Sequence, residues 1–236
     1  MTVTHQSLDA SPLAVPTARR AAARARTVAA AGVVFPAAVL LHEGAHYLAA
    51  RLFGFHDVAL HYAAATYDGD AFWNAIRAGN LAAARLLLDP AHAAIVSALG
   101  PLTTYAVLAV CVSLARSGRL TPHDATAGEP SAWWGALLGL GLATPLRSIA
   151  AAPRLVLMAL GHTRPSGTDE GQVAAITGVP EALLQLLGLC TLLAGWYLLL
   201  RTGRRLGGRG YVARVVLGTI LGAATYIGLV GPRLLP

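Results

Sequence analysis

Two histidines and a glutamate inside an apolar segment are the residues of this chain best suited to chemistry. His42-Glu43-Gly44-Ala45-His46 has the pattern H-E-x-x-H. Residues four apart share one face of a helix, so His42 and His46 could both offer ring nitrogens to a single zinc ion. Glu43 would then stand beside the metal and accept a proton from the water that the metal activates.

The apolar setting of this motif favours metal binding over chance. Each charged group at the centre of a membrane helix costs roughly 2.5–3.5 kcal/mol, so three ionisable side chains among valines, leucines and alanines need a compensating partner. A metal ion is one such partner. The alternative is a structural cluster near the membrane edge in which Glu43 pairs with an arginine.

Composition predicts a multi-pass membrane protein. Of the 236 residues, 56% are hydrophobic and 12% are charged, whereas soluble domains carry about 25% charged residues. The net charge is +7, and all 18 basic residues are arginines. They lie mostly at the ends of apolar segments, which argues against nucleic-acid binding and favours contact with the headgroups of a bilayer. We expect the plasma membrane of a prokaryote, and the sequence leaves the oligomeric state open.

The hydrophobic pattern predicts an all-α fold with about five to six transmembrane helices. We expect a disordered basic tail over residues 1–26 and a single membrane-embedded domain over residues 27–236. The expected spans are 27–50, 91–115, a third run from Trp133 that is broken around Pro145 and Pro153, 181–200 and 215–229, with 201–214 as a basic loop. The positive-inside rule places the basic tail and this loop on the cytoplasmic side.

The segment between the first two spans has a different character. Residues 58–67 are rich in β-formers and predict a small hairpin or extended edge, with a turn at 68–70. Residues 74–88 predict one amphipathic helix along the interface. Elsewhere, the pairs Gly135/Gly139 and Gly218/Gly222 are spaced for close contact between helices.

Two stretches carry a family resemblance. Residues 42–54, from the H-E-x-x-H motif to Arg51-Leu52-Phe53-Gly54, resemble the first active-site helix of the site-two protease family of intramembrane zinc metalloproteases. Leu99-Gly100-Pro101-Leu102 is similar to the Gly-Pro helix that follows in many members. The resemblance implies a hydrolase that uses Zn²⁺ to cleave peptide bonds in or near transmembrane segments. Its substrates would be membrane proteins or leftover signal peptides.

The same resemblance implies an aspartate as the third zinc ligand, usually within Leu-Asp-Gly. That tripeptide does not occur here. The nearest match is Thr168-Asp169-Glu170-Gly171, so Asp169 is the first candidate, with Glu170 or His162 as substitutes. In the alternative interpretation, Thr168 or Asp169 is an ordinary helix N-cap.

His61 and Arg147 are candidates for contact with a substrate. His61 lies in the predicted hairpin, whose strand could pair with an extended substrate. Arg147 is unusual inside an apolar run: it could snorkel, pair with Asp169 or Glu170, or stabilise a developing oxyanion. A rival interpretation of the whole chain is a non-catalytic membrane protein of the same fold, or a transporter that handles metal ions.

Overall fold

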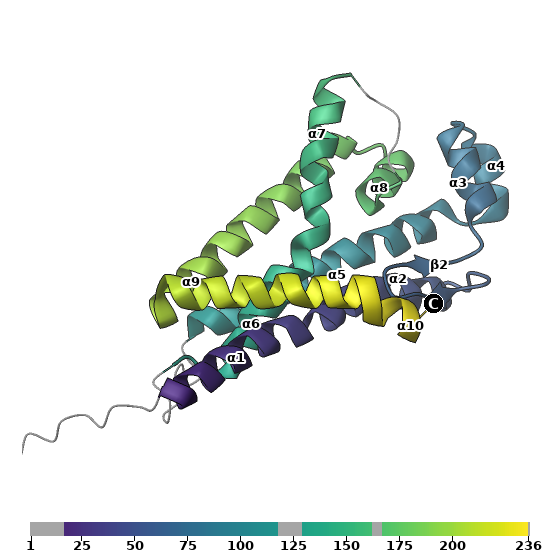
Figure 1. Ribbon diagram of the computed structural model, residues 1–236. Coiled ribbons are helices and arrows are strands. Elements are labelled where there is room, and N and C mark those ends of the chain that lie inside the picture. Colours follow the sequence, from purple (N-terminus) through teal and green to yellow (C-terminus); the bar gives the residue numbers. More distant parts are fainter. Residues whose placement is uncertain (1–16, 118–128, 162–166, 236) are drawn as a thin grey trace, which may run out of the picture.

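The computed structural model describes residues 17–117, 129–161 and 167–235. The described chain is mostly helical and contains one small two-stranded sheet, as predicted (Figure 1). Four helices in these ranges are long and apolar enough to cross a membrane: Thr17–Leu52, Pro90–Ser117, Ala132–Ala159 and Glu181–Leu234.

The first of these spans is a bent pair of helices. α1 (Thr17–Val33) and α2 (Phe35–Leu52) meet at Val34, and Pro36 occupies the first turn of α2, where its missing N–H costs little. The predicted tail is wrong for residues 17–26, because they belong to α1; residues 1–16 lie outside the described residues. Alanine and arginine are strong helix formers, and the side chain of Arg24 is bound to Glu129 at 2.8 Å.

The hairpin exists, but its turn and the following helix differ from the prediction. β1 (Ala59–Leu60) pairs antiparallel with β2 (Ala65–Thr66), so the turn falls at 61–64 and not at 68–70. The predicted single helix over 74–88 is two helices, α3 (Asp70–Arg77) and α4 (Leu81–Leu87). They are separated at Gly79, whose φ of +72° lies in the left-handed region that glycine adopts without strain.

The next two spans differ in continuity. α5 (Pro90–Ser117) is a single helix that contains Pro101. The third apolar run is broken, as predicted: α6 (Ala132–Ala143) continues into the 3₁₀ segment η1 (Thr144–Ala150) and then into α7 (Ala151–Ala159). The 3₁₀ segment carries Arg147, whose guanidinium reaches the buried Glu43 while much of its side chain stays exposed.

The remaining elements correct two predictions. The polar stretch 161–180 contains the helix α8 (Asp169–Thr177), which only the interpretation of Thr168 or Asp169 as an N-cap had anticipated. The expected loop 201–214 is mostly helical, because α9 (Glu181–Thr225) leaves the helical conformation only at Gly207 and Gly208. There α9 reverses and returns alongside α1 (Figure 1). It ends in the π-helical turn η2 (Tyr226–Val230) and in α10 (Gly231–Leu234).

The two predicted glycine pairs are helix contacts, and both flank α1. A Cβ atom at Gly139 would lie 2.7 Å from the carbonyl oxygen of Ala31, so α6 packs directly on the backbone of α1. Gly218 and Gly222 make an equally close approach from the returning half of α9, against Val28 and Gly32. Next to these contacts lies a hydrophobic core, which includes Ala31 and is formed among others by Trp134, Leu138, Leu199, Tyr211 and Val215.

Candidate metal centre

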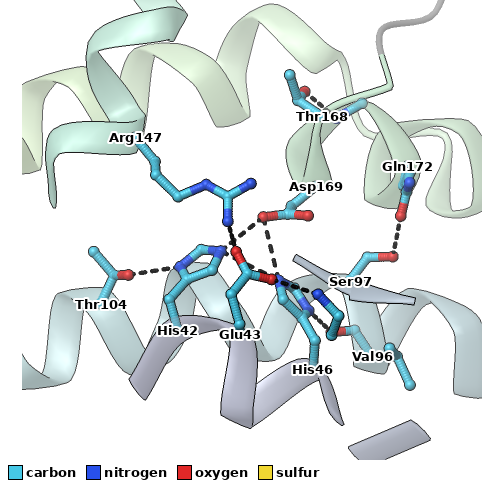
Figure 2. Close-up of polar contacts among 12 residues, drawn as sticks. His42, Glu43, His46, Val96, Ser97, Thr104, Arg147, Thr168, Asp169 and Gln172 are labelled. Atoms are coloured by element: carbon cyan, nitrogen blue, oxygen red, sulfur yellow. Dashed lines mark hydrogen bonds and ion pairs between the residues drawn. The ribbon is translucent and has the colours of Figure 1, made fainter. Parts of the chain in front are cut away.

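The histidines and the glutamate of the motif are buried on α2, at the face that packs against α5. Relative exposures are 4% for His42, 2% for Glu43 and 8% for His46. Figure 2 shows both imidazole rings projecting from α2 towards α5 and α8. The helical spacing therefore places the two rings together, as predicted.

Asp169 joins this pair. It is the first residue of α8, and its Oδ2 lies 3.1 Å from Nε2 of His42 and 3.4 Å from Nε2 of His46. The two Nε2 atoms are 3.2 Å apart. Among the described residues, His42, His46 and Asp169 form a group that could hold a metal ion.

The outer nitrogens of both rings have fixed partners. Nδ1 of His46 donates a hydrogen bond to the carbonyl oxygen of Val96 at 2.6 Å, because a carbonyl oxygen can only accept. In the neutral ring, the lone pair is then on Nε2 and points at Asp169. Nδ1 of His42 lies 2.9 Å from Oγ1 of Thr104, which can accept in the same way. Such outer hydrogen bonds orient the imidazole ligands of metal sites.

Helix α8 is anchored on both sides, and this anchoring positions Asp169. Thr168 is the N-cap: its hydroxyl accepts from the backbone N–H of Gly171 at 3.2 Å and from the buried amide of Gln185 at 3.0 Å. Ser97 on α5 donates to the side-chain oxygen of Gln172 at 2.7 Å. Thr168 therefore caps the helix, as the alternative interpretation predicted, while Asp169 faces the histidines.

The electrostatics of the two adjacent acids differ. Burial favours the neutral form of Asp169, but the adjacent imidazoles of His42 and His46 outweigh it, and the pKa of this carboxyl lies well below its ordinary value. The carboxyl group of Asp169 is thus ionised at neutral pH and is suited to bind a metal ion. Burial raises the pKa of Glu170, whose side chain lines a cavity next to the centre and is not part of the His–His–Asp group.

A glycine on α5 makes room for the two rings. A Cβ atom at position 100 would lie 2.7 Å from Nε2 of His42 and closer still to Nε2 of His46. Real Cβ atoms do not approach other atoms so closely, and the obstacle would be the donor nitrogens themselves. The rings can converge at this point because residue 100 is glycine.

Glu43 has two partners in this structure. Its Oε2 accepts a hydrogen bond from the backbone N–H of Ala65 at 2.9 Å, so the outer edge of β2 faces the centre. Its Oε1 forms an ion pair with the guanidinium of Arg147 from η1 (Figure 2). The side chain of Arg147 is 52% exposed, whereas that of Glu43 is 3% exposed. The ion pair thus connects the buried carboxylate to the surface of the protein.

Two cavities lie next to the His–His–Asp group. A cavity of about 190 Å³ is bounded by His42, Thr104, Ser148, Glu170 and other residues, and one of about 410 Å³ extends along β2, Trp73 and Ser97. Arg147, Gly167 and Asp169 line both. The polar centre therefore borders two cavities that are lined in part by charged and polar side chains.

The other candidates lie outside this arrangement. His61 lies in the turn of the hairpin, bonds Oγ1 of Thr66 at 3.0 Å and lines neither cavity. His162 falls outside the described residues. Sequence reasoning missed the residues that orient the centre, namely Thr104 and the carbonyl of Val96. Thr104 carried a detectable signal, because it is a hydroxyl residue in an apolar run one helical turn after Gly100.

Comparison of the chain with family models, with curated proteins and with solved structures finds no match.

Proposed function

We propose that this protein is an intramembrane zinc metalloprotease that hydrolyses peptide bonds in or near transmembrane segments. The observation that carries the proposal is the convergence of the His42, His46 and Asp169 donors beside the buried carboxylate of Glu43, in a chain whose described residues include four helices apolar enough to cross a membrane. Two imidazoles and one carboxylate are a donor set of catalytic zinc sites, which keep a fourth position open.

The spacing of the three donor atoms fits zinc. In a tetrahedral site with metal–ligand distances of about 2.0–2.1 Å, neighbouring ligand atoms lie about 3.3–3.4 Å apart. The three distances here are 3.1, 3.2 and 3.4 Å. With the proton of His46 held on Nδ1 by Val96, the lone pair of Nε2 faces an ionised carboxylate. The imidazole lone pair and the carboxylate are both acceptors, so a cation between them would stabilise this contact.

A zinc ion in this site would supply Lewis acidity, which polarises a peptide carbonyl and makes water more acidic. Glu43 would accept the proton of the attacking water and then pass it to the leaving nitrogen. The Glu43 carboxylate is bound on both oxygens in the present structure. We therefore propose that Arg147 and the N–H of Ala65 hold Glu43 in a resting position and release it when a substrate binds.

The same two groups suggest how a substrate would be held. The N–H of Ala65 points from the outer edge of β2 into the centre, so an extended peptide laid along β2 could take this hydrogen bond as an added strand. Arg147, once separated from Glu43, could bind the polarised carbonyl oxygen. Membrane proteins and leftover signal peptides are the proposed substrates. A structure with a bound peptide analogue in which the Glu43–Arg147 ion pair persists would contradict this step.

Removal and return of the metal test the proposed activity. The purified protein, in detergent or liposomes, is assayed for cleavage of a single-span reporter substrate. We expect cleavage to stop after treatment with a zinc chelator and to return when zinc is added, because the residues of the centre lack their own electrophile. Zinc-loaded protein that cleaves none of a panel of single-span substrates would favour a non-catalytic membrane protein of this fold.

A further inference from the structure

A stripe of arginines marks one face of α9, far along the chain from the His–His–Asp group. Arg201, Arg204 and Arg205 follow Tyr197 at spacings of four, seven and eight residues, which place them on one side of the helix. Together with Leu200 they line a cavity of about 480 Å³. The chain of α9 reverses shortly after Arg205, at Gly207 and Gly208. This cavity therefore lies beside the end of an apolar helical segment.

The three guanidinium groups are not neutralised within the described part of the chain, where none of them pairs with a carboxylate. The nearby Glu129 is already bound by Arg24 and by Arg214, each at 2.8 Å. Through Glu129, these two ion pairs link α1 to the returning half of α9. Within the described residues, Glu129 is thus already paired, which leaves Arg201, Arg204 and Arg205 available to an anionic ligand.

The same face of α9 is apolar in the two turns before the arginines. Leu193 and Tyr197 lie two turns and one turn before Arg201, and they are 55% and 62% exposed. The helix thus presents an apolar strip that leads into a cluster of positive charges. Guanidinium groups bind phosphate oxygens in bidentate fashion, and an acyl chain can cover exposed leucine and tyrosine. One molecule that offers both chemistries is a phospholipid.

We propose that the cavity formed by Tyr197, Leu200, Arg201, Arg204 and Arg205 binds the phosphate headgroup of an anionic phospholipid, with an acyl chain along Leu193 and Tyr197. The leaflet that holds this lipid is then the one that contains the turn of α9. The proposal does not depend on the proteolytic activity.

Native mass spectrometry of the full-length protein in detergent tests this site. Phosphatidylglycerol and phosphatidylcholine are titrated separately, and inorganic phosphate is added as a competitor. The variant Arg201→Gln/Arg204→Gln/Arg205→Gln is compared with Arg51→Gln/Arg77→Gln/Arg85→Gln, which removes the same charge from exposed arginines elsewhere. At about fivefold for each arginine, the first triple variant should lose phosphatidylglycerol affinity on the order of 100-fold, and the second should keep it.

A lysine variant controls for a loss of affinity that is caused by misfolding. Arg201→Lys/Arg204→Lys/Arg205→Lys retains the charge and loses the bidentate geometry, so a partial loss of affinity is expected. Equal losses in the two glutamine variants would show that net charge alone attracts the lipid and would overturn the site. Equal affinity for both lipids, or displacement of the lipid by inorganic phosphate alone, would overturn it as well.

Discussion

Glu43→Gln is expected to lower the rate of substrate cleavage on the order of 10³-fold, within the range that a general base contributes, while the metal stays bound. Glutamine has the shape of glutamate and can still accept the hydrogen bond from Ala65, but it cannot take a proton from water. The His–His–Asp donors are unchanged, so zinc content should equal that of the wild type. The loss should fall on kcat with little change in KM, because Glu43 acts in the transition state.

Glu129→Gln is the matched control for this substitution. Glu129 is also a carboxylate held by arginine, through ion pairs with Arg24 and Arg214, but it lies near the turn of α9, away from the centre. The Glu129→Gln protein should cleave the reporter substrate at a rate near that of the wild type. A Glu43→Gln protein that cleaves the reporter at the wild-type rate would contradict the proposed mechanism.

Gly100→Ala is expected to abolish metal binding through a single added methyl group. The new Cβ atom would occupy space now taken by Nε2 of both histidines, and neither ring can retreat without breaking its hydrogen bond to Val96 or Thr104. Overpacking of a tight interior typically costs 1–3 kcal/mol, and here the atoms that must move are the donors. Zinc content and cleavage should fall together, as measured by metal analysis and by the reporter assay.

Gly44→Ala supplies the control, because it adds the same methyl group inside the motif itself. No atom lies within 4 Å of a Cβ atom at position 44, and alanine is favoured over glycine within a helix by roughly 1 kcal/mol. This variant should keep its zinc and should not lose thermal stability. If Gly100→Ala binds zinc as tightly as Gly44→Ala, the close packing of α5 against the rings does not shape the centre.

Local sequence patterns predicted which residues form the His–His–Asp group better than they predicted the contacts that support it. The spacing of His42 and His46 is a property of any helix, so their convergence needed no tertiary information. Asp169 was a weaker inference, since its approach depends on α8, which the polar, glycine-marked sequence concealed. Its anchoring by Gln185 and Gln172 arises from helices distant in sequence. Contacts of this kind leave no periodic signal.

The errors in the fold prediction have a common physical origin. Arginine-rich and polar stretches were predicted as tail or loop, yet residues 17–26 and most of 201–214 are helical. Arginine is a good helix former and can extend an apolar helix beyond the membrane interior. In contrast, backbone conformation decided the actual breaks, at Gly79 and Gly208, both with φ in the left-handed region.

The zinc content of the purified full-length protein, compared with that of Asp169→Ala, is the most direct test of the central claim. We expect one tightly bound zinc per wild-type chain, with an X-ray absorption spectrum that indicates coordination by two imidazole nitrogens and by oxygen ligands. Asp169→Ala should weaken binding by more than the roughly 10–100-fold typical of changes to outer partners. Wild-type protein that takes up no zinc, or Asp169→Ala protein that binds it as tightly, would contradict the His42–His46–Asp169 centre.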